Sequence, residues 1–358
     1  AVLRLLLARR WRELPRLFPP SGIILYVAIT APWFWAVSRA NPDFFDFSFV
    51  QERLVRYLTR THDRCEPFWY FVPVLPAALV PWTGMLLEAL HVARGKWNVL
   101  SRGDGLFLGL WFAVPFLFFS LSGSKPIPCI APCMPPLAIL IGAALDVLAQ
   151  GRAGALAMSR RFVVLNGLLL LPLAAAGVLY PALSSRPGAG ELYGYTLPAS
   201  VALLLFWGAS LILHRRRDFS RMPAILCVLA LLSAFAFSRG FEAKARSDSP
   251  AEVAALVGER AGRDERVVAY GSLMEGLSFY LERRIVVAGE LDGLAFGAAQ
   301  EPDPRWFLDD EGLRALWNGA DRVLLVTKRK HEERLRSALG REPVRLGETP
   351  AYVLFANF

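Results

Sequence analysis

The sequence predicts an α-helical polytopic membrane protein with a soluble α/β domain at its carboxyl end. Hydrophobic residues make up 54% of the 358 residues and charged residues only 20%. Several apolar runs reach the length of about 20 residues that a helix needs to cross a bilayer. Near Arg239 the composition changes, and short apolar segments begin to alternate with charged ones. We therefore expect an interfacial helix at 1–20, a transmembrane domain at 21–238 and an extracytoplasmic α/β domain at 239–358.

The transmembrane domain begins after an arginine-rich segment. Residues 1–20 mix leucines with five arginines and end in a Pro-Pro pair, which predicts an amphipathic helix on the cytoplasmic membrane surface. The apolar runs that follow predict about seven transmembrane helices. Three prolines interrupt the second of these helices, and the pair Pro81 and Trp82 predicts a kink in it. The expected spans are 21–40, 68–90, 105–121, 127–149, 162–182, 197–213 and 222–238.

The distribution of lysine and arginine predicts the orientation of these spans. Residues 1–238 contain 22 Lys and Arg against 11 Asp and Glu, whereas residues 239–358 contain 18 against 20. The basic excess therefore belongs to the membrane part, which argues against nucleic-acid binding. Fifteen of these 22 basic residues lie in segments on one side of the membrane, which the positive-inside rule places in the cytoplasm. Because the number of predicted spans is odd, the carboxyl end then lies outside. The fifteen fall in segments 1–20, 91–104, 150–161 and 214–221.

The outer loop at 41–67 carries a stripe of arginines. Arg53, Arg56, Arg60 and Arg64 are spaced by three, four and four residues, so on a helix they lie along one face. A guanidinium group binds phosphate through two parallel hydrogen bonds, which makes this stripe a candidate phosphate site. A surface helix attracted to anionic lipid headgroups explains the same pattern equally well.

His62, Trp69 and Tyr70 lie between this stripe and the second span. A histidine in a polar loop is either a base or an ordinary surface residue. The rings of Trp69 and Tyr70 suit the membrane interface, and they also suit stacking on a sugar or a hydrogen bond to one.

The segment SLSGSKPIPCIAPCMPP, from Ser120 to Pro136, joins the third and fourth spans. Its five prolines obstruct a helix, and irregular backbone at membrane depth is tolerated only where protein or a water-filled cavity covers it. Lys125 lies inside this segment, and an ammonium at the membrane edge indicates an anionic ligand. A short hairpin with a snorkelling lysine is the alternative.

No cofactor is expected from the sequence. Cys129 and Cys133 lie one helical turn apart, but without neighbouring histidines or carboxylates they do not form a metal site, and a divalent metal finds no support. The four cysteines form no disulfide framework. The carboxyl-terminal part has no phosphate loop. Its expected helices are 250–262, 272–281, one within 303–318 and 328–339, and its expected strands are 266–270, 283–289, 322–327, 343–347 and 351–356.

Two segments, LTRTHDRCEPFWYFVPVLPAALVPW (58–82) and FFSLSGSKPIPCIAPCMPPLAIL (118–140), lie between multiple spans and precede an outward α/β domain. In this combination the chain resembles the family 39 glycosyltransferases, more narrowly the aminoarabinose transferases of lipid A, within the C-type superfamily of integral-membrane glycosyltransferases. The resemblance covers nearly all of the chain. Family members have more spans than the seven predicted here, so the resemblance implies a carboxyl-terminal portion that begins at Ala1 and lacks the first spans.

The resemblance implies transfer of a sugar from a polyprenyl-phosphate donor to a lipid A-type glycolipid or a protein, on the outer face of the bacterial inner membrane. The family's catalytic Asp lies in a first outer loop expected upstream of Ala1, so this chain alone is expected to be inactive. Pro126 departs from the leucine that is commoner in the family. The donor phosphate would be held by Lys125, Arg56, Arg60 and His62, with Trp69 and Tyr70 as sugar or lipid contacts.

Two other functions remain open from the residues alone. A transporter or flippase component is one, because broken helices near a charged residue also mark transport sites. The other is a membrane anchor that displays the outer α/β domain as a binding module.

Overall fold

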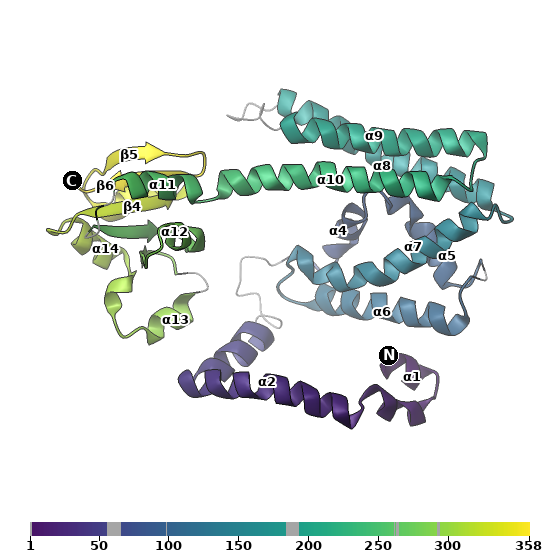
Figure 1. Ribbon diagram of the computed structural model, residues 1–358, viewed down its shortest axis with the longest axis horizontal. Helices are drawn as coiled ribbons and strands as arrows, with labels where there is room; N and C mark the ends of the chain where they lie inside the picture. Colours follow the sequence, from purple (N-terminus) through teal and green to yellow (C-terminus); the bar gives the residue numbers. More distant parts are fainter. Residues whose placement is uncertain are drawn as a thin grey trace. The chain divides into compact units, whose positions relative to one another are not determined.

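The computed structural model divides the chain into two compact units, Ala1–Ser238 and Arg239–Phe358 (Figure 1). Within the described residues the first unit is helical and the second contains a six-stranded sheet. The predicted fold class, a polytopic helical protein with a carboxyl-terminal α/β domain, is confirmed. The structure describes residues 2–55, 66–97, 99–183, 193–260, 262, 265–291 and 294–358.

Six helices in these ranges are long and apolar enough to cross a membrane, and a bent pair brings the number to seven if it makes one crossing. The last helix, α10, continues past the boundary between the two units. The elements of the first unit are α1 (Val2–Leu7), η1 (Trp11–Leu17), α2 (Pro20–Ala40), η2 (Asp46–Val55), α4 (Phe71–Ala78), η3 (Thr83–Met85), α5 (Leu86–Ala93), α6 (Arg102–Leu121), η4 (Ile127–Cys133), α7 (Met134–Ala149), α8 (Ala155–Leu183), α9 (Tyr193–Arg216) and α10 (Met222–Asp248).

The second predicted span, 68–90, is not one helix. It is broken into α4 and the η3–α5 segment, which meet at 112°. Pro81 lies in the break, where its ring and missing N–H prevent a continuous helix. Thr83 donates a hydrogen bond of 2.7 Å from Oγ1 to the carbonyl oxygen of Pro76 near the end of α4, which also accepts one of 3.2 Å from the N–H of Leu79.

The bent pair nevertheless runs along the length of α6. Phe71, at the start of α4, belongs to a buried cluster with Phe116 and Phe119 near the end of α6. At the other end, Gly105 packs so closely on α5 that a Cβ there would lie 2.6 Å from the carbonyl oxygen of Ala93. Because α6 is itself a candidate span, this arrangement favours a single crossing by α4 and α5.

The amino-terminal residues differ from the predicted single helix at 1–20. They form α1 and the 3₁₀ helix η1, separated near Arg9, whose φ of 55° is incompatible with a continuing helix. Arg4 of α1 lies 3.7 Å from a carboxylate oxygen of Asp104 and 5.6 Å from the ring centre of Phe107, so α1 contacts the first turns of α6. In the predicted outer loop, Asp46–Val55 forms a π-helix, and residues 56–65 lie outside the described ranges.

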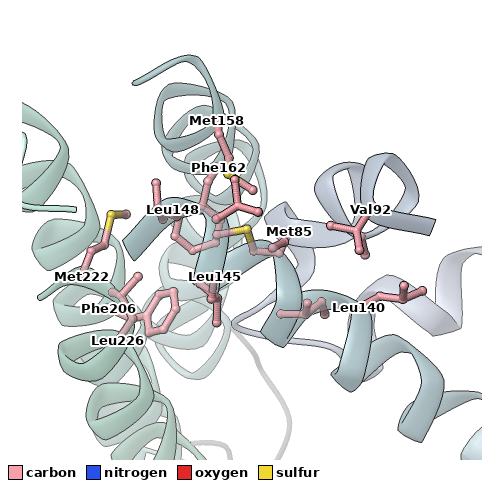
Figure 2. Close-up of a cluster of buried hydrophobic side chains, with 14 of the residues drawn as sticks. Met85, Val92, Leu140, Leu145, Leu148, Met158, Phe162, Phe206, Met222 and Leu226 are labelled. Carbon is pink, nitrogen blue, oxygen red and sulfur yellow. The ribbon is translucent and has the colours of Figure 1, made fainter. Parts of the chain in front are cut away.

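The core of the first unit lies where η3, α5, α7, α8, α9 and α10 meet (Figure 2). Met85, Leu148 and Phe162 are completely buried there. Asn166 of α8 is also completely buried, and its Oδ1 accepts a hydrogen bond of 2.9 Å from the backbone N–H of Gly84. This bond satisfies a backbone donor of η3, where the bent pair has no helical partner for it.

In the second unit the strand order is β3-β2-β1-β4-β6-β5. Strands β3, β2, β1 and β4 are parallel to one another, and β6 is antiparallel to both of its neighbours, β4 and β5. The sequence predicted five of the six strands; it missed β3, which has two residues, and the short helix α13. The elements are α11 (Ala251–Arg260), β1 (Arg266–Tyr270), α12 (Glu275–Tyr280), β2 (Val286–Ala288), α13 (Ala295–Gln300), η7 (Pro304–Trp306), β3 (Phe307–Leu308), α14 (Asp310–Trp317), β4 (Val323–Lys328), η8 (Arg329–His331), α15 (Glu332–Leu339), β5 (Val344–Glu348) and β6 (Tyr352–Ala356).

Strand β4 is buried on both of its faces. Leu324 and Val326 pack in the cluster that includes residues of α11 and α12, whereas Val323 and Leu325 pack with residues of α14 and α15. Successive side chains of a strand point to opposite faces, so the continuous apolar run VLLV supplies both cores. The second unit is thus a three-layer α/β domain with helices on both sides of its sheet (Figure 1).

The contact between Gly84 and α8 yields the first prediction. A Cβ at Gly84 would lie 2.8 Å from Asn166 Oδ1 and 2.9 Å from the carbonyl oxygen of Phe162. Gly84→Ala should therefore destabilise the chain by about 1–3 kcal/mol, the usual cost of overpacking a core. Thermal unfolding of the purified chain in detergent measures the effect.

Gly142→Ala is the matched control. Gly142 also lies in a helix of the first unit, but a Cβ there meets nothing within 4 Å. Its replacement should be neutral or should stabilise by up to about 1 kcal/mol, because alanine is the better helix former. Equal unfolding temperatures for the two variants would show that Gly84 does not pack tightly on α8.

Candidate functional site

Lys125 lies in the turn between α6 and η4. Helix α6 ends at Leu121, and the N–H of Ser122 donates a hydrogen bond of 3.3 Å to the carbonyl oxygen of Phe119. Pro126 then precedes η4, where a proline costs no hydrogen bond because the first N–H groups of a helix have no helical partner. The prolines therefore start the next span and leave only a short irregular segment, which contains the lysine.

The turn holds a buried ammonium group. Lys125 is only 6% exposed, and its Nζ donates a short hydrogen bond to the carbonyl oxygen of Ser122. Ser122 Oγ in turn donates to the carbonyl oxygen of Ser124 at 3.0 Å, which fixes the turn. An ammonium has three N–H donors, so two are left for other partners. In the described ranges no carboxylate forms an ion pair with Lys125, and a buried charge without a counter-ion is costly.

A pocket of about 270 Å³ opens beside Lys125. Tyr70 lies on one side of it and is half-buried, and Glu66 contributes a carboxylate to the same pocket. The sequence analysis assigned Glu66 no role, because nothing in its spacing indicates that it meets a residue 59 positions further along the chain. The lining residues are Glu66, Tyr70, Lys125, Pro126, Ile127 and Pro128.

The aromatic segment before α4 is anchored beneath this pocket. Phe71 is completely buried, in a cluster with Leu75 of α4, Ile130 of η4 and Leu137 of α7. The ring of Tyr70 contacts that of Phe71 edge to face, with ring centres 5.3 Å apart. Trp69, by contrast, is 53% exposed and is not among the residues that line the pocket.

Of the six residues proposed for the site, the structure brings Lys125 and Tyr70 together in one pocket and leaves Trp69 outside its lining. Arg56, Arg60 and His62 lie outside the described residues. The pocket begins at Glu66, directly after that segment of the chain.

The second unit also contains an arginine-lined pocket, of about 290 Å³. Most of its arginines already pair with carboxylates: Arg266 lies 3.1 Å from Asp321, and Arg305 lies 2.8 Å from Asp303. Hydrogen bonds from Arg305 hold the pKa of Asp303 down at about 2. The fourth arginine, Arg283, donates a hydrogen bond of 3.3 Å to the backbone carbonyl oxygen of Glu265. Because most of its arginine charges are already paired, we do not choose this pocket as the candidate anion site. Across the described ranges no group of three or more His, Cys, Asp or Glu side chains could hold a metal ion.

Comparison with known proteins links both units to one group of enzymes. Residues 253–355 match a family model described as the aminoarabinose transferase C-terminal domain. The undecaprenyl phosphate-alpha-4-amino-4-deoxy-L-arabinose arabinosyl transferase 2 of Pseudomonas fluorescens is 36% identical over 239 residues, which is 63% of this chain and 40% of that protein. The corresponding transferase of Edwardsiella ictaluri is 33% identical over 230 residues, 63% of this chain and 41% of that protein.

Solved structures show the same likeness over the whole chain. The crystal structure of ArnT from Cupriavidus metallidurans bound to undecaprenyl phosphate matches with a TM-score of 0.78 at 25% identity, covering 100% of this chain and 64% of that one. The same protein in the apo state matches with a TM-score of 0.77 at 24% identity, over 63% of its chain. This chain thus spans about 40% of the length of the curated relatives it matches.

Proposed function

We propose that this chain, which is similar to the aminoarabinose transferases of glycosyltransferase family 39, binds the phosphate of a polyprenyl-phosphate sugar donor in the Lys125 pocket. The reaction is transfer of the donor's sugar to an acceptor of the lipid A type. The relatives named above are arabinosyl transferases, and one solved relative was crystallised with undecaprenyl phosphate. These findings support 4-amino-4-deoxy-L-arabinose as the sugar and undecaprenyl phosphate as its carrier.

The observation that carries the proposal is the buried ammonium of Lys125, which has unused donors and, among the described residues, no carboxylate within ion-pair distance, although Glu66 lines the same pocket. A phosphate monoanion or dianion supplies the missing charge and accepts the remaining N–H groups. Ile127 and the neighbouring prolines give the pocket an apolar wall, which suits the first carbons of a polyprenyl chain.

The chemistry of the reaction gives Lys125 a role beyond binding. When the glycosidic bond breaks, the bonding electron pair goes to the phosphate oxygen and the leaving group gains negative charge. A cation already held in place stabilises that charge more strongly in the transition state than in the ground state. Tyr70 lines the same pocket, and we propose it as a further contact of the donor's sugar or lipid. Arg56, Arg60 and His62 are proposed as further phosphate-binding residues, and Trp69 as a lipid or sugar contact outside the pocket lining.

The chain is a multi-pass membrane protein, and its proposed location is the bacterial inner membrane. The charge distribution supports an outer position for the Lys125 turn, because its segment lies on the side with seven of the 22 basic residues. The second unit lies on that same side in this topology. A protein acceptor finds no support among the relatives' names, whereas a glycolipid acceptor agrees with the lipid A-type family.

The transporter alternative has one structural observation in its favour, the broken pair α4 and α5 beside the pocket. The same break is explained by the prolines and by the packing of α5 on α6. No observation on the first unit requires movement of a substrate across the membrane, and the transferase proposal accounts for the unpaired cation directly.

Replacing Lys125 tests the proposed phosphate contact. Lys125→Gln keeps a hydrogen-bond donor of similar reach but removes the charge. A charge-assisted hydrogen bond contributes about 1.5–3 kcal/mol, so the affinity of the purified chain for undecaprenyl phosphate should fall by about ten- to a hundredfold. Titration of that lipid in detergent, followed by native mass spectrometry, measures the change.

Lys96→Gln is the control for the loss of one lysine charge, because Lys96 lies in the predicted cytoplasmic segment 91–104. It should leave the affinity unchanged. If Lys125→Gln bound undecaprenyl phosphate as tightly as the unmodified chain while unfolding at the same temperature, the assignment of Lys125 would be wrong.

Replacing Glu66 should have the opposite effect to replacing Lys125. The carboxylate of Glu66 lines the same pocket and repels a bound phosphate, so Glu66→Gln should strengthen binding of undecaprenyl phosphate. Two unit charges in water interact by about 1 kcal/mol, so the affinity should rise by up to about fivefold. Asp146→Asn removes a carboxylate that hydrogen-bonds Gln150 near the end of α7 and should have no effect. Weaker binding by Glu66→Gln would instead show that this carboxylate orients Lys125 or the lipid.

A further inference from the structure

A second groove lies on the membrane unit, between α5 and the first turns of α8. Its volume is about 600 Å³. Its walls are apolar and accessible: Leu87, Leu156 and Val164 are 38%, 45% and 52% exposed. Two consecutive arginines, Arg160 and Arg161, line the same groove. Apolar walls beside cationic groups form an amphipathic surface.

The two arginines are not equivalent. Arg161 donates from Nε to Oε1 of Glu88 at 2.6 Å, and the other oxygen of that carboxylate lies 3.0 Å from Nδ1 of His91. Glu88 is completely buried, and a buried carboxylate in a membrane protein persists only when it is paired. The pair therefore fixes Arg161 at the wall of the groove and neutralises its charge.

Arg160 retains its positive charge. Its side chain is exposed, and in the described part of the chain it forms no ion pair with a carboxylate. The adjacent Ser159 Oγ lies 2.8 Å from Nδ1 of His214, which brings the end of α9, with Arg215, close to this region. The groove is thus lined by the unpaired guanidinium group of Arg160, and the basic end of α9 lies nearby.

The groove and the Lys125 pocket lie at opposite ends of α6. Lys125 lies four residues after Leu121, the last residue of α6. Ala93, at the end of α5, packs against Gly105 in the first turn of α6. A helix of 20 residues is about 30 Å long, which is about the thickness of the hydrocarbon core. A lipid in one site therefore does not reach the other with its headgroup.

We propose that this groove binds an anionic phospholipid of the cytoplasmic leaflet, with its phosphate at Arg160 and an acyl chain along Leu87, Leu156 and Val164. The segments at the groove's end of α6, 91–104 and 150–161, are two of the basic segments that the positive-inside rule assigns to the cytoplasm. That leaflet carries the anionic lipids, and basic pockets between transmembrane helices on this side bind their headgroups. Charge complementarity thus favours an anionic phospholipid over a purely apolar partner helix.

The first test compares lipids and charges. The purified chain in detergent is titrated with dioleoylphosphatidylglycerol or dioleoylphosphatidylcholine, and bound lipid is counted by native mass spectrometry. The unmodified chain should bind the anionic lipid more tightly. Arg160→Gln should reduce that binding about fivefold, the effect of one basic residue at a membrane surface. Arg102→Gln removes an exposed arginine from the same predicted side but outside the groove, and should leave the affinity unchanged.

The second test fills the groove without changing its charge. Ala157 is an exposed lining residue, so Ala157→Trp should block the acyl chain and abolish the Arg160-dependent binding. Leu168→Trp, at a residue of α8 that is 72% exposed and outside the groove, is the control. Unfolding temperatures are measured for every variant, and Arg160→Gln keeps the proposal testable if the tryptophan variant does not fold.

Three results would overturn the proposal. Equal losses in Arg160→Gln and Arg102→Gln would show a diffuse charge effect and no site. Full binding by a folded Ala157→Trp would place the lipid elsewhere. If undecaprenyl phosphate displaced dioleoylphosphatidylglycerol stoichiometrically and with the same sensitivity to Arg160→Gln, the groove would be a second site for the polyprenyl lipid and not one for a phospholipid.

Discussion

The membrane unit depends on one physical constraint: a charged side chain that is buried away from water needs a partner of opposite charge or a hydrogen-bonding partner. Among the residues that the structure describes, it buries two side chains of charged type, and their surroundings differ. Glu88 is completely buried and has two partners, the guanidinium group of Arg161 and the imidazole ring of His91. Lys125 is almost as buried, yet its only described hydrogen bond is to a carbonyl oxygen. The first arrangement is a structural contact within the chain, whereas the second leaves room for the phosphate that we propose as the ligand of Lys125.

The bent pair α4 and α5 connects these two charges. Its first residues support the Lys125 pocket through Phe71, and its last turns carry Glu88. Two hydrogen bonds stabilise the break between them, one from Thr83 to the carbonyl oxygen of Pro76 and one from the N–H of Gly84 to Asn166, which lies inside the protein.

The second unit follows a simpler rule. Three of its four parallel strands, β1, β2 and β4, are almost wholly buried, with α11 and α12 packed on one face of the sheet and α14 and α15 on the other. Three of the four arginines of its pocket, Arg266, Arg284 and Arg305, pair with carboxylates of the same unit, which favours a structural role for that pocket. The likeness to the aminoarabinose transferases covers this unit as well as the membrane unit, so it is a regular part of the fold and not an unrelated addition.

The sequence by itself determined the membrane class, the position of nearly every span, the α/β pattern after Arg239 and the place of Lys125 in an irregular turn between two spans. These features depend on local composition and periodicity, which the chain displays directly. Only the tertiary structure decided that 68–90 is a bent pair, that Glu66 shares a pocket with Lys125, and that Arg161 neutralises Glu88. Those pairings join residues 59 and 73 positions apart, and they arise from helix packing, which no local pattern encodes.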